Sequence, residues 1–294
     1  MTTAAILGAA LAAALAYLGG FAAAAFARRT GVIDEPGGRK GHTAPTPLLG
    51  GGALAAAWLL VVGAGGTAAT GVLLGAIAAW ALGTFDDLKP KGLGAGWKLA
   101  GQLGVAAVWL AASGYHGAAA LGGAACVLFA MNGFNLLDNT DGLCCIAALP
   151  PALCLTAVAG GEDTGWAFAA AALAGGLLGY LPHSWPRARV FLGDGGSHLI
   201  GFVLGALAFE AALASPSAPG ARVLALPALF ALALADTATV TVNRLRRGAP
   251  PWVGDRTHLS HRLHRAGFAE PAALLVLGAV AAAGALLAAL LLRG

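Results

Sequence analysis

Long apolar segments alternate with short polar ones along almost the whole chain. Segments long enough to cross a lipid bilayer as a helix occupy residues 4–27, 50–65, 68–85, 98–114, 117–133, 143–160, 164–182, 197–214, 221–243 and 270–292. The pattern predicts about ten transmembrane helices and no separate soluble domain. We therefore expect an all-α integral membrane protein whose residues 1–294 form a single polytopic domain.

The composition agrees with a membrane interior. Of the 294 residues, 59% are hydrophobic and only 10% are charged, whereas about 25% are charged in soluble domains. Glycine pairs spaced four apart let transmembrane helices approach closely, and they occur at Gly71/Gly75, Gly175/Gly179 and Gly201/Gly205. We expect these pairs to pack helices within one chain rather than to form a dedicated dimer interface. A homodimer remains an open alternative.

The four cysteines lie in or beside apolar segments, at Cys126, Cys144, Cys145 and Cys154. They form no Cys-x-x-Cys motif, and long extracellular loops that would need disulfides are absent from the pattern. We expect them to be small buried hydrophobic residues.

The positive charges are strongly asymmetric along the chain. If all ten helices span, the segments 28–49, 86–97, 134–142, 183–196 and 244–269 share one face, with Lys98 at its helix edge. That face holds all 17 Lys and Arg residues except Arg222 and Arg293. The positive-inside rule makes this face cytoplasmic and places both termini outside the cytoplasm. The net charge of +4 therefore reflects membrane topology, and we expect no nucleic-acid partner.

Carboxylates gather at the ends of apolar segments on this same face. Asp86 and Asp87 follow an apolar run, and Asp138, Asp141 and Asp194 lie in similar places. An acid carried toward hydrocarbon costs several kcal/mol and is functional by default, whereas adjacent anions need a raised pKa or a cation. Loop or helix caps are the alternative interpretation of each residue alone. The five together predict a shared metal and phosphate site.

Polar and basic residues accompany the acids. Asn132, Asn135 and Asp138 are three residues apart, so a continuing helix would place them on one face, where a nucleotide could bind. Lys98 opens an apolar helix, where its ammonium could meet an anion or act only as an anchor. In the Gly- and Pro-rich segment 34–51, Lys40 and His42 could bind phosphate, or could belong to an ordinary positive loop.

The most basic segment is the last loop. Residues 244–265 contain six arginines and three histidines, including Arg244, Arg256, His258 and His261. His258 and His261 have a spacing that resembles that of metal ligands, but no Cys or carboxylate completes a zinc set. We therefore expect this loop to contact phosphate rather than metal.

The five segments together resemble the polyprenyl-phosphate N-acetylhexosamine-1-phosphate transferase superfamily (glycosyltransferase family 4). The motifs appear in the family's order along the whole chain: Arg39-Lys40-x-His42 with Pro47-x-x-Gly50-Gly51, Asp86-Asp87 then Lys98-Leu99, Asn132 and Asn135 before Asp138 and Asp141-Gly142-Leu143, Phe191-x-Gly193-Asp194-x-Gly196-Ser197, and Arg244 to Arg256-x-His258.

The resemblance implies a membrane enzyme of about ten helices with a cytoplasmic active site in the plasma (inner) membrane. Such enzymes use Mg²⁺, for which Mn²⁺ can substitute, and move a sugar-1-phosphate from a UDP-sugar to a polyprenyl phosphate, releasing UMP. The product starts cell-envelope glycan synthesis, such as that of lipopolysaccharide or teichoic acid.

Matched residue by residue, the resemblance also assigns roles. Asp86 and Asp87 would serve the lipid phosphate and the metal, with Asp194 a principal Mg²⁺ ligand. The other expected site residues are Asp138 and His258 in catalysis, and Lys40, His42, Lys98, Asn132, Asn135, Asp141, Phe191, Arg244, Arg256 and His261 in substrate binding.

One departure concerns the last loop. The branch that selects simple sugars carries His-x-His-His, whereas this chain has His258-Leu259-Ser260-His261, which removes one potential cation. The loop still resembles the N-acetylglucosamine branch more than the UDP-MurNAc-pentapeptide branch, which carries three consecutive histidines. A membrane transporter is the alternative of a different class, because intramembrane acids and broken helices also occur there.

Overall fold

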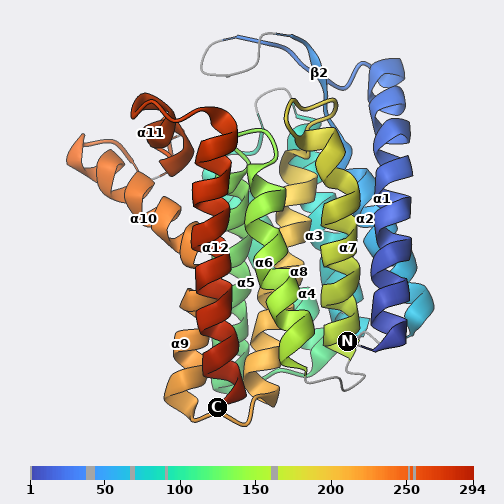
Figure 1. Cartoon of the computed structure of the whole chain (residues 1–294), viewed down its shortest axis with the longest axis vertical. Helices are drawn as coiled ribbons and strands as arrows, with labels where there is room; N and C mark the ends of the chain where they lie inside the picture. The colour runs from blue at the N-terminus through green and yellow to red at the C-terminus, as the bar shows by residue number, and fades with distance from the viewer. Residues whose placement is uncertain are drawn as a thin grey trace.

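The computed structural model describes residues 2–37, 44–66, 70–89, 92–159, 165–250, 252–253 and 256–294. Most of the helices in these residues form a bundle along one common axis (Figure 1). Both chain termini lie at the same end of this bundle, and the strands and α11 lie at the other end (Figure 1). This second end is called the loop end below.

Each predicted apolar segment contains helix within its described residues. The helices are α1 (Thr3–Thr30), α2 (Gly50–Gly65), α3 (Thr70–Asp87), α4 (Ala95–Ser113), α5 (Gly117–Leu137), α6 (Leu143–Val158), α7 (Gly165–Ser184), α8 (Gly193–Ala214), α9 (Pro219–Leu229), α10 (Ala231–Arg246), α11 (Leu259–Arg265) and α12 (Glu270–Arg293). Two short strands, β1 (Ile33–Asp34) and β2 (Thr46–Pro47), pair antiparallel. The all-α class predicted from the pattern is confirmed.

Among the described residues, five helices are long and apolar enough to cross a membrane, namely α1, α5, α7, α8 and α12. The pair α9–α10 is bent by 67° and adds a sixth span if it is counted as one. The chain is therefore a multi-pass membrane protein. The prediction of a single uninterrupted helix over 221–243 is wrong. Pro227 removes a backbone donor just before the break, and α10 is polar and points away from the bundle (Figure 1).

Helix α8 forms the centre of the bundle and packs against α3, α5, α2, α6 and α7. Glycine allows the closest contacts between helices. A Cβ atom at Gly201 would lie 2.5 Å from the Met131 Cα atom of α5, and one at Gly179 would lie 2.0 Å from the Ala13 carbonyl oxygen of α1. The expectation that the glycine pairs pack helices within the chain is confirmed.

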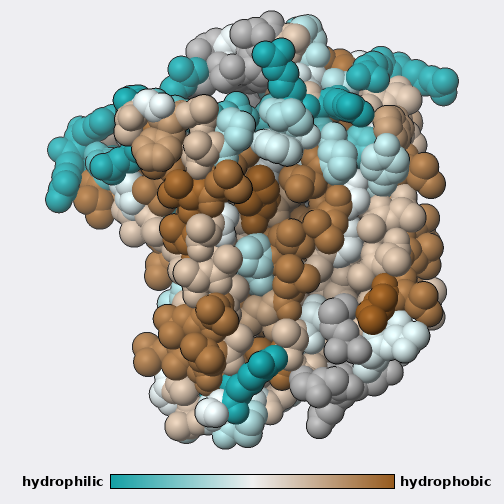
Figure 2. All heavy atoms as spheres, viewed as in Figure 1, coloured by the Kyte–Doolittle hydropathy of each residue, from teal (hydrophilic) through white to brown (hydrophobic). Residues whose placement is uncertain are grey.

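Hydrophilic and hydrophobic residues are segregated along the bundle axis. Figure 2 shows a brown apolar zone over the middle of the visible face and most of the teal side chains at the loop end. Within the apolar interior, the four cysteines are free and buried, as expected. This distribution places the polar chemistry of the molecule at one end.

Candidate active site at the loop end

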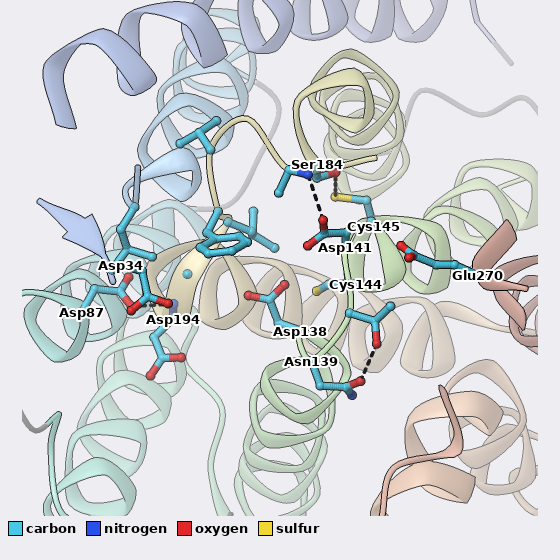
Figure 3. Close-up of a pocket in the computed structure, with 18 of the residues that line it drawn as sticks. Asp34, Asp87, Asp138, Asn139, Asp141, Cys144, Cys145, Ser184, Asp194 and Glu270 are labelled. Atoms are coloured by element: carbon cyan, nitrogen blue, oxygen red, sulfur yellow. Dashed lines mark hydrogen bonds between the residues drawn. The ribbon is translucent and has the colours of Figure 1, made fainter. Parts of the chain in front are cut away.

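A cavity of about 710 Å³ opens among the segments of the loop end. Five residues predicted from the sequence as acids or as a nucleotide contact line it: Asp87, Asp138, Asp141, Phe191 and Asp194. Arg256 and His261 of the basic loop also line it. The cavity therefore brings together carboxylates (Figure 3), an arginine and a histidine that are far apart in the sequence.

Asp87 ends α3 and binds the beginning of α8. Its Oδ1 accepts a hydrogen bond from the Asp194 amide at 2.9 Å, and its Oδ2 accepts one from the Gly195 amide at 3.0 Å. These are unpaired donors of a helix N-terminus, where a negative charge is favoured. Gly83 makes the approach of the two helices feasible, because a Cβ there would lie 2.1 Å from the Asp194 carbonyl oxygen. Asp87 thus has a structural role as a cap in addition to facing the cavity.

Lys98 of α4 lies between two carboxylates. Its ammonium nitrogen is 2.7 Å from Oδ2 of the buried Asp86 and also contacts Asp194 Oδ2. The other oxygen of Asp194 accepts a hydrogen bond from Asn135 Nδ2 at 2.6 Å. Asp86, Lys98 and Asn135 do not line the cavity and reach it through Asp194. The cluster fixes the Asp194 carboxylate from both of its oxygens.

Asp138 lies between the Asp87–Asp194 pair and Asp141 (Figure 3). Burial, and then the charges of Asp194, Asp87 and Asp141, raise the pKa of Asp138 well above its ordinary value of 3.8. Asp141 accepts a hydrogen bond from the Ala188 amide at 2.9 Å. Its carboxylate therefore holds the segment after α7 instead of capping α6. The concentration of acids at this wall favours a bound cation.

A polar network extends from this cluster into the bundle. Gln102 Nε2 lies 3.1 Å from His198 Nε2, and His198 Nδ1 lies 2.9 Å from the Asp194 carbonyl oxygen. Gln102 Oε1 accepts a hydrogen bond from Asn132 Nδ2 at 2.8 Å. Asn132 is therefore occupied by Gln102 and is not on the cavity wall. The prediction placed Asn132, Asn135 and Asp138 on one face. Asp138 lines the cavity and Asn135 binds Asp194, whereas Asn132 binds Gln102 instead.

In the basic loop, the residues that face the cavity are not those with the deepest burial. His261 and Arg256 line the cavity, whereas His258 and Arg244 are about 5% and 4% exposed and do not. Burial, and then the neighbouring His258 and Arg256, lower the pKa of His261 below its ordinary value of 6.5. At neutral pH, His261 therefore offers a neutral imidazole to the cavity.

His258 instead pairs with a buried acid of α10. Its Nδ1 lies 2.8 Å from Asp236 Oδ2, and Asp236 Oδ1 accepts a hydrogen bond from the Leu259 amide at 2.7 Å. Nearby, Ser260 Oγ donates to Asn139 Oδ1 at 2.6 Å. Both contacts join α11 to other parts of the chain.

Comparison with known proteins identifies the family of this chain. Residues 69–212, which include the Asp86–Asp87 pair and Asp194, match the model of glycosyl transferase family 4. A decaprenyl-phosphate N-acetylglucosaminephosphotransferase of Mycolicibacterium smegmatis is 33% identical over a match of 296 residues, gaps included. The match covers 85% of this chain and 72% of the relative. The chain belongs to glycosyl transferase family 4. The superfamily and branch predicted from the five motifs are confirmed.

Two other named proteins are similar to this chain. The decaprenyl-phosphate N-acetylglucosaminephosphotransferase of Mycobacterium tuberculosis is 33% identical over 301 residues, covering 85% of this chain and 73% of the relative. An undecaprenyl-phosphate alpha-N-acetylglucosaminyl 1-phosphate transferase of Escherichia coli is 32% identical over 158 residues, covering 52% of this chain and 42% of the relative. Membership of this transferase family argues against the transporter alternative.

The carboxylates of this family 4 protein fit a cation that is held by few protein ligands. Within the part of the chain that the structure describes, no group of three or more His, Cys, Asp or Glu side chains has the geometry of a metal site. Mg²⁺, however, is commonly held by one or two carboxylates, with waters and substrate phosphates completing its shell. Asp194 and Asp87 provide two carboxylates at the cavity wall, and each oxygen has lone pairs beyond the hydrogen bonds described above.

Two predicted substrate-binding residues, Lys40 and His42, lie outside the described residues. In the other direction, the structure adds residues that sequence reasoning did not single out. Asp34, Asn139, His264 and Glu270 line the cavity, and Asp236 pairs with His258. Asp236 carried a readable signal, because it is an acid inside the apolar window 221–243. The same argument that identified Asp86 would have found it.

Proposed function

We propose that this family 4 protein transfers N-acetylglucosamine-1-phosphate from UDP-N-acetylglucosamine to a polyprenyl phosphate. UMP is released, and the lipid-linked sugar diphosphate starts a cell-envelope glycan. The observation that carries the proposal is one cavity that unites Asp87, Asp138 and Asp194 with Arg256 and His261. Relatives matched over 85% of the chain carry the name of an N-acetylglucosamine phosphotransferase.

The reaction exchanges one phosphoanhydride bond for another. An oxygen of the polyprenyl phosphate attacks the phosphorus that bears the sugar, and the bond from that phosphorus to the UMP oxygen breaks. A phosphate monoester has a second pKa of about 6, so the attacking oxygen is already largely ionised near pH 7. The protein therefore needs no strong base, and its main tasks are alignment and charge neutralisation.

Asp194 and Asp87 would hold Mg²⁺, which supplies neutralisation of the phosphate charges when it is bound. The protein's own groups would do the rest. Lys98 keeps Asp86 and Asp194 in fixed positions and lowers the net negative charge next to the cavity. Asp138, Asp141 and Phe191 line the wall where we place the nucleotide.

The basic loop would bind the other end of the donor. Arg256 lines the cavity, and a guanidinium can bind two phosphate oxygens at once in a planar fork. His261, as a neutral imidazole, can donate or accept a hydrogen bond at the sugar or diphosphate. A compact clamp of this kind suits a simple UDP-N-acetylhexosamine better than a peptide-bearing donor.

We further propose that all ten apolar segments cross the plasma membrane, with the cavity on the cytoplasmic side and both termini on the opposite side. Two observations support this arrangement. All Lys and Arg residues except Arg222 and Arg293 belong to the segments assigned to one face. Both termini lie at the end of the bundle away from the cavity-bearing loops (Figure 1).

The direct test incubates purified protein with Mg²⁺, undecaprenyl phosphate and separate UDP-sugars, and measures UMP and lipid-linked product. We expect UDP-N-acetylglucosamine to be used and labelled UMP to exchange back into it, because the bonds broken and formed are of the same kind. Use of UDP-MurNAc-pentapeptide without UDP-N-acetylglucosamine would overturn the proposed donor. Release of UMP at the same rate without lipid would indicate a hydrolase.

A further inference from the structure

The short helix α11 is attached to the rest of the protein by a carboxylate on a different helix. Asp236 of α10 is 1% exposed. One of its oxygens binds His258 Nδ1 at 2.8 Å, and the other accepts the Leu259 amide at 2.7 Å. His258 is the residue that precedes the first turn of α11, so Asp236 supplies an acceptor to the start of this helix and orients the adjacent imidazole.

A second buried contact holds the same helix from another side. Ser260, also 1% exposed, donates its hydroxyl to Asn139 Oδ1 at 2.6 Å. Asn139 follows Asp138 in the turn between α5 and α6, and it accepts a second hydrogen bond from Thr140 Oγ1 at 2.9 Å. Helix α11 is thus fixed between α10 and the turn that carries Asp138 and Asp141.

These two contacts, together with packing of α11 against α12, place the basic-loop side of the cavity. Arg256, His261 and His264 line the cavity, whereas Asp236 and Ser260 do not. Arg265 Nη1 donates to the Arg256 carbonyl oxygen at 2.9 Å, which ties the segment before α11 to the end of the same helix. Arg256 and His261 are therefore carried by one small unit whose position depends on its attachment.

We propose that Asp236 and Ser260 are positioning residues that hold Arg256 and His261 on the cavity wall, where they bind the diphosphate-sugar donor. This inference rests on the proposed function. It also assigns a role to Ser260, the position where the resemblance led us to expect a histidine. The serine is buried and acts through Asn139, so it does not remove a cation from the wall of the cavity.

The expected effect on donor binding follows from the fraction of molecules in which α11 is docked. If α11 is docked for only a fraction of the time, the apparent dissociation constant of the donor rises by the inverse of that fraction. We place the lipid phosphate at the acidic wall, away from α11, so its apparent affinity should not change. Loss of an anchor should therefore raise KM for the nucleotide sugar and leave KM for the polyprenyl phosphate unchanged. General destabilisation of the fold would lower the amount of active enzyme and would not produce this split.

The experiment compares the full-length variants Asp236→Ala, Asp236→Asn and Ser260→Ala in detergent. A matched control is Ser215→Ala, which removes a similar buried hydroxyl whose hydrogen bond to the Leu292 carbonyl oxygen measures 2.6 Å. KM is measured separately for UDP-N-acetylglucosamine and for undecaprenyl phosphate. UMP affinity and hydrogen exchange of the peptide 256–265 are measured without turnover.

We expect Asp236→Ala to raise the donor KM by about tenfold or more and to speed exchange in 256–265. Ser260→Ala should do the same to a smaller extent. Asp236→Asn keeps an oxygen for the Leu259 amide and an amide donor for His258 Nδ1, so it should recover most of the donor affinity. Ser215→Ala should leave both KM values unchanged.

Three outcomes would overturn the inference. They are an unchanged donor KM and unchanged exchange in Asp236→Ala, an equal rise of both KM values, and the same defect in Asp236→Asn as in Asp236→Ala. Failure of the wild-type protein to use any UDP-sugar would instead overturn the proposed function. The exchange measurement would still decide whether Asp236 and Ser260 hold α11 in place.

Discussion

At the scale of single residues, the site is dominated by carboxylates that already have partners. Asp87 binds two amides of α8, and Asp194 binds Lys98 and Asn135. Such contacts fix the direction of a carboxylate before any ligand arrives, which is the preorganisation that phosphoryl transfer requires. The same contacts explain why these acids are tolerated near an apolar interior, because each charge is paired or hydrogen-bonded.

Asp194→Asn should abolish most of the turnover while leaving the fold intact. The substitution keeps the size of the side chain but removes a charge that faces both Lys98 and the proposed cation. We expect kcat to fall by about 100-fold or more, measured as UMP release at saturating donor and lipid. Thermal unfolding in detergent provides the control for folding. Near-wild-type activity with the same Mg²⁺ dependence would show that the metal lies elsewhere.

At the scale of elements, close packing of glycine faces and the break after α9 matter most. The glycine faces bring α8 near α5 and α3, and α7 near α1, so that the ends of α3 and α8 meet at Asp87 and Asp194. The break turns α10 away from the bundle and leaves Asp236 where it can reach His258. Packing of whole helices thus decides which polar side chains become neighbours.

Gly179→Ala should destabilise the protein, because its new Cβ would lie 2.0 Å from the Ala13 carbonyl oxygen. Backbone cannot yield as a flexible side chain can, so we expect a loss of about 1–3 kcal/mol in stability, seen as a lower unfolding temperature. Gly104→Ala is the matched control, since no atom lies within 4 Å of its added Cβ. Equal unfolding temperatures for the two variants would contradict the packing described for α1 and α7.

At the scale of the whole molecule, one end of the bundle carries the chemistry and the other carries the termini (Figures 1 and 2). This polarity suits an enzyme whose nucleotide donor is soluble and whose acceptor is a membrane lipid. The hydrophobic middle of the visible face separates the two ends. Orientation in the membrane should therefore follow the positive charge.

The topology can be tested with single introduced cysteines. All four native cysteines are buried, so a membrane-impermeant maleimide should label them little in intact cells. Trp252→Cys lies at a 70% exposed position of the basic loop, and Gly294→Cys lies at the C-terminus. We expect labelling from outside the cytoplasm at position 294 and none at 252. The reverse result would invert the orientation and move the proposed active site to the other side.

The sequence by itself determined the class of the protein, the position of every apolar helix except the broken one at 221–243, and most of the acidic cluster. It could do so because the length of an apolar segment and the placement of Lys and Arg in loops are local properties of the sequence. The bilayer selects on both of them directly. The order of the five motifs likewise identified the superfamily, and the comparisons confirmed it.

Only the tertiary structure decided which partner each polar residue has. Asp87 and Asp194 lie 107 residues apart yet meet through an amide, and Ser260 and Asn139 are separated by 121 residues. Nothing in the local pattern around Asp236 or Ser260 indicates such partners, because they depend on the 67° bend between α9 and α10 and on how closely the helices pack. Contacts between distant segments are fixed by the packing of the whole bundle, and so these residues acquired a role only in the folded chain.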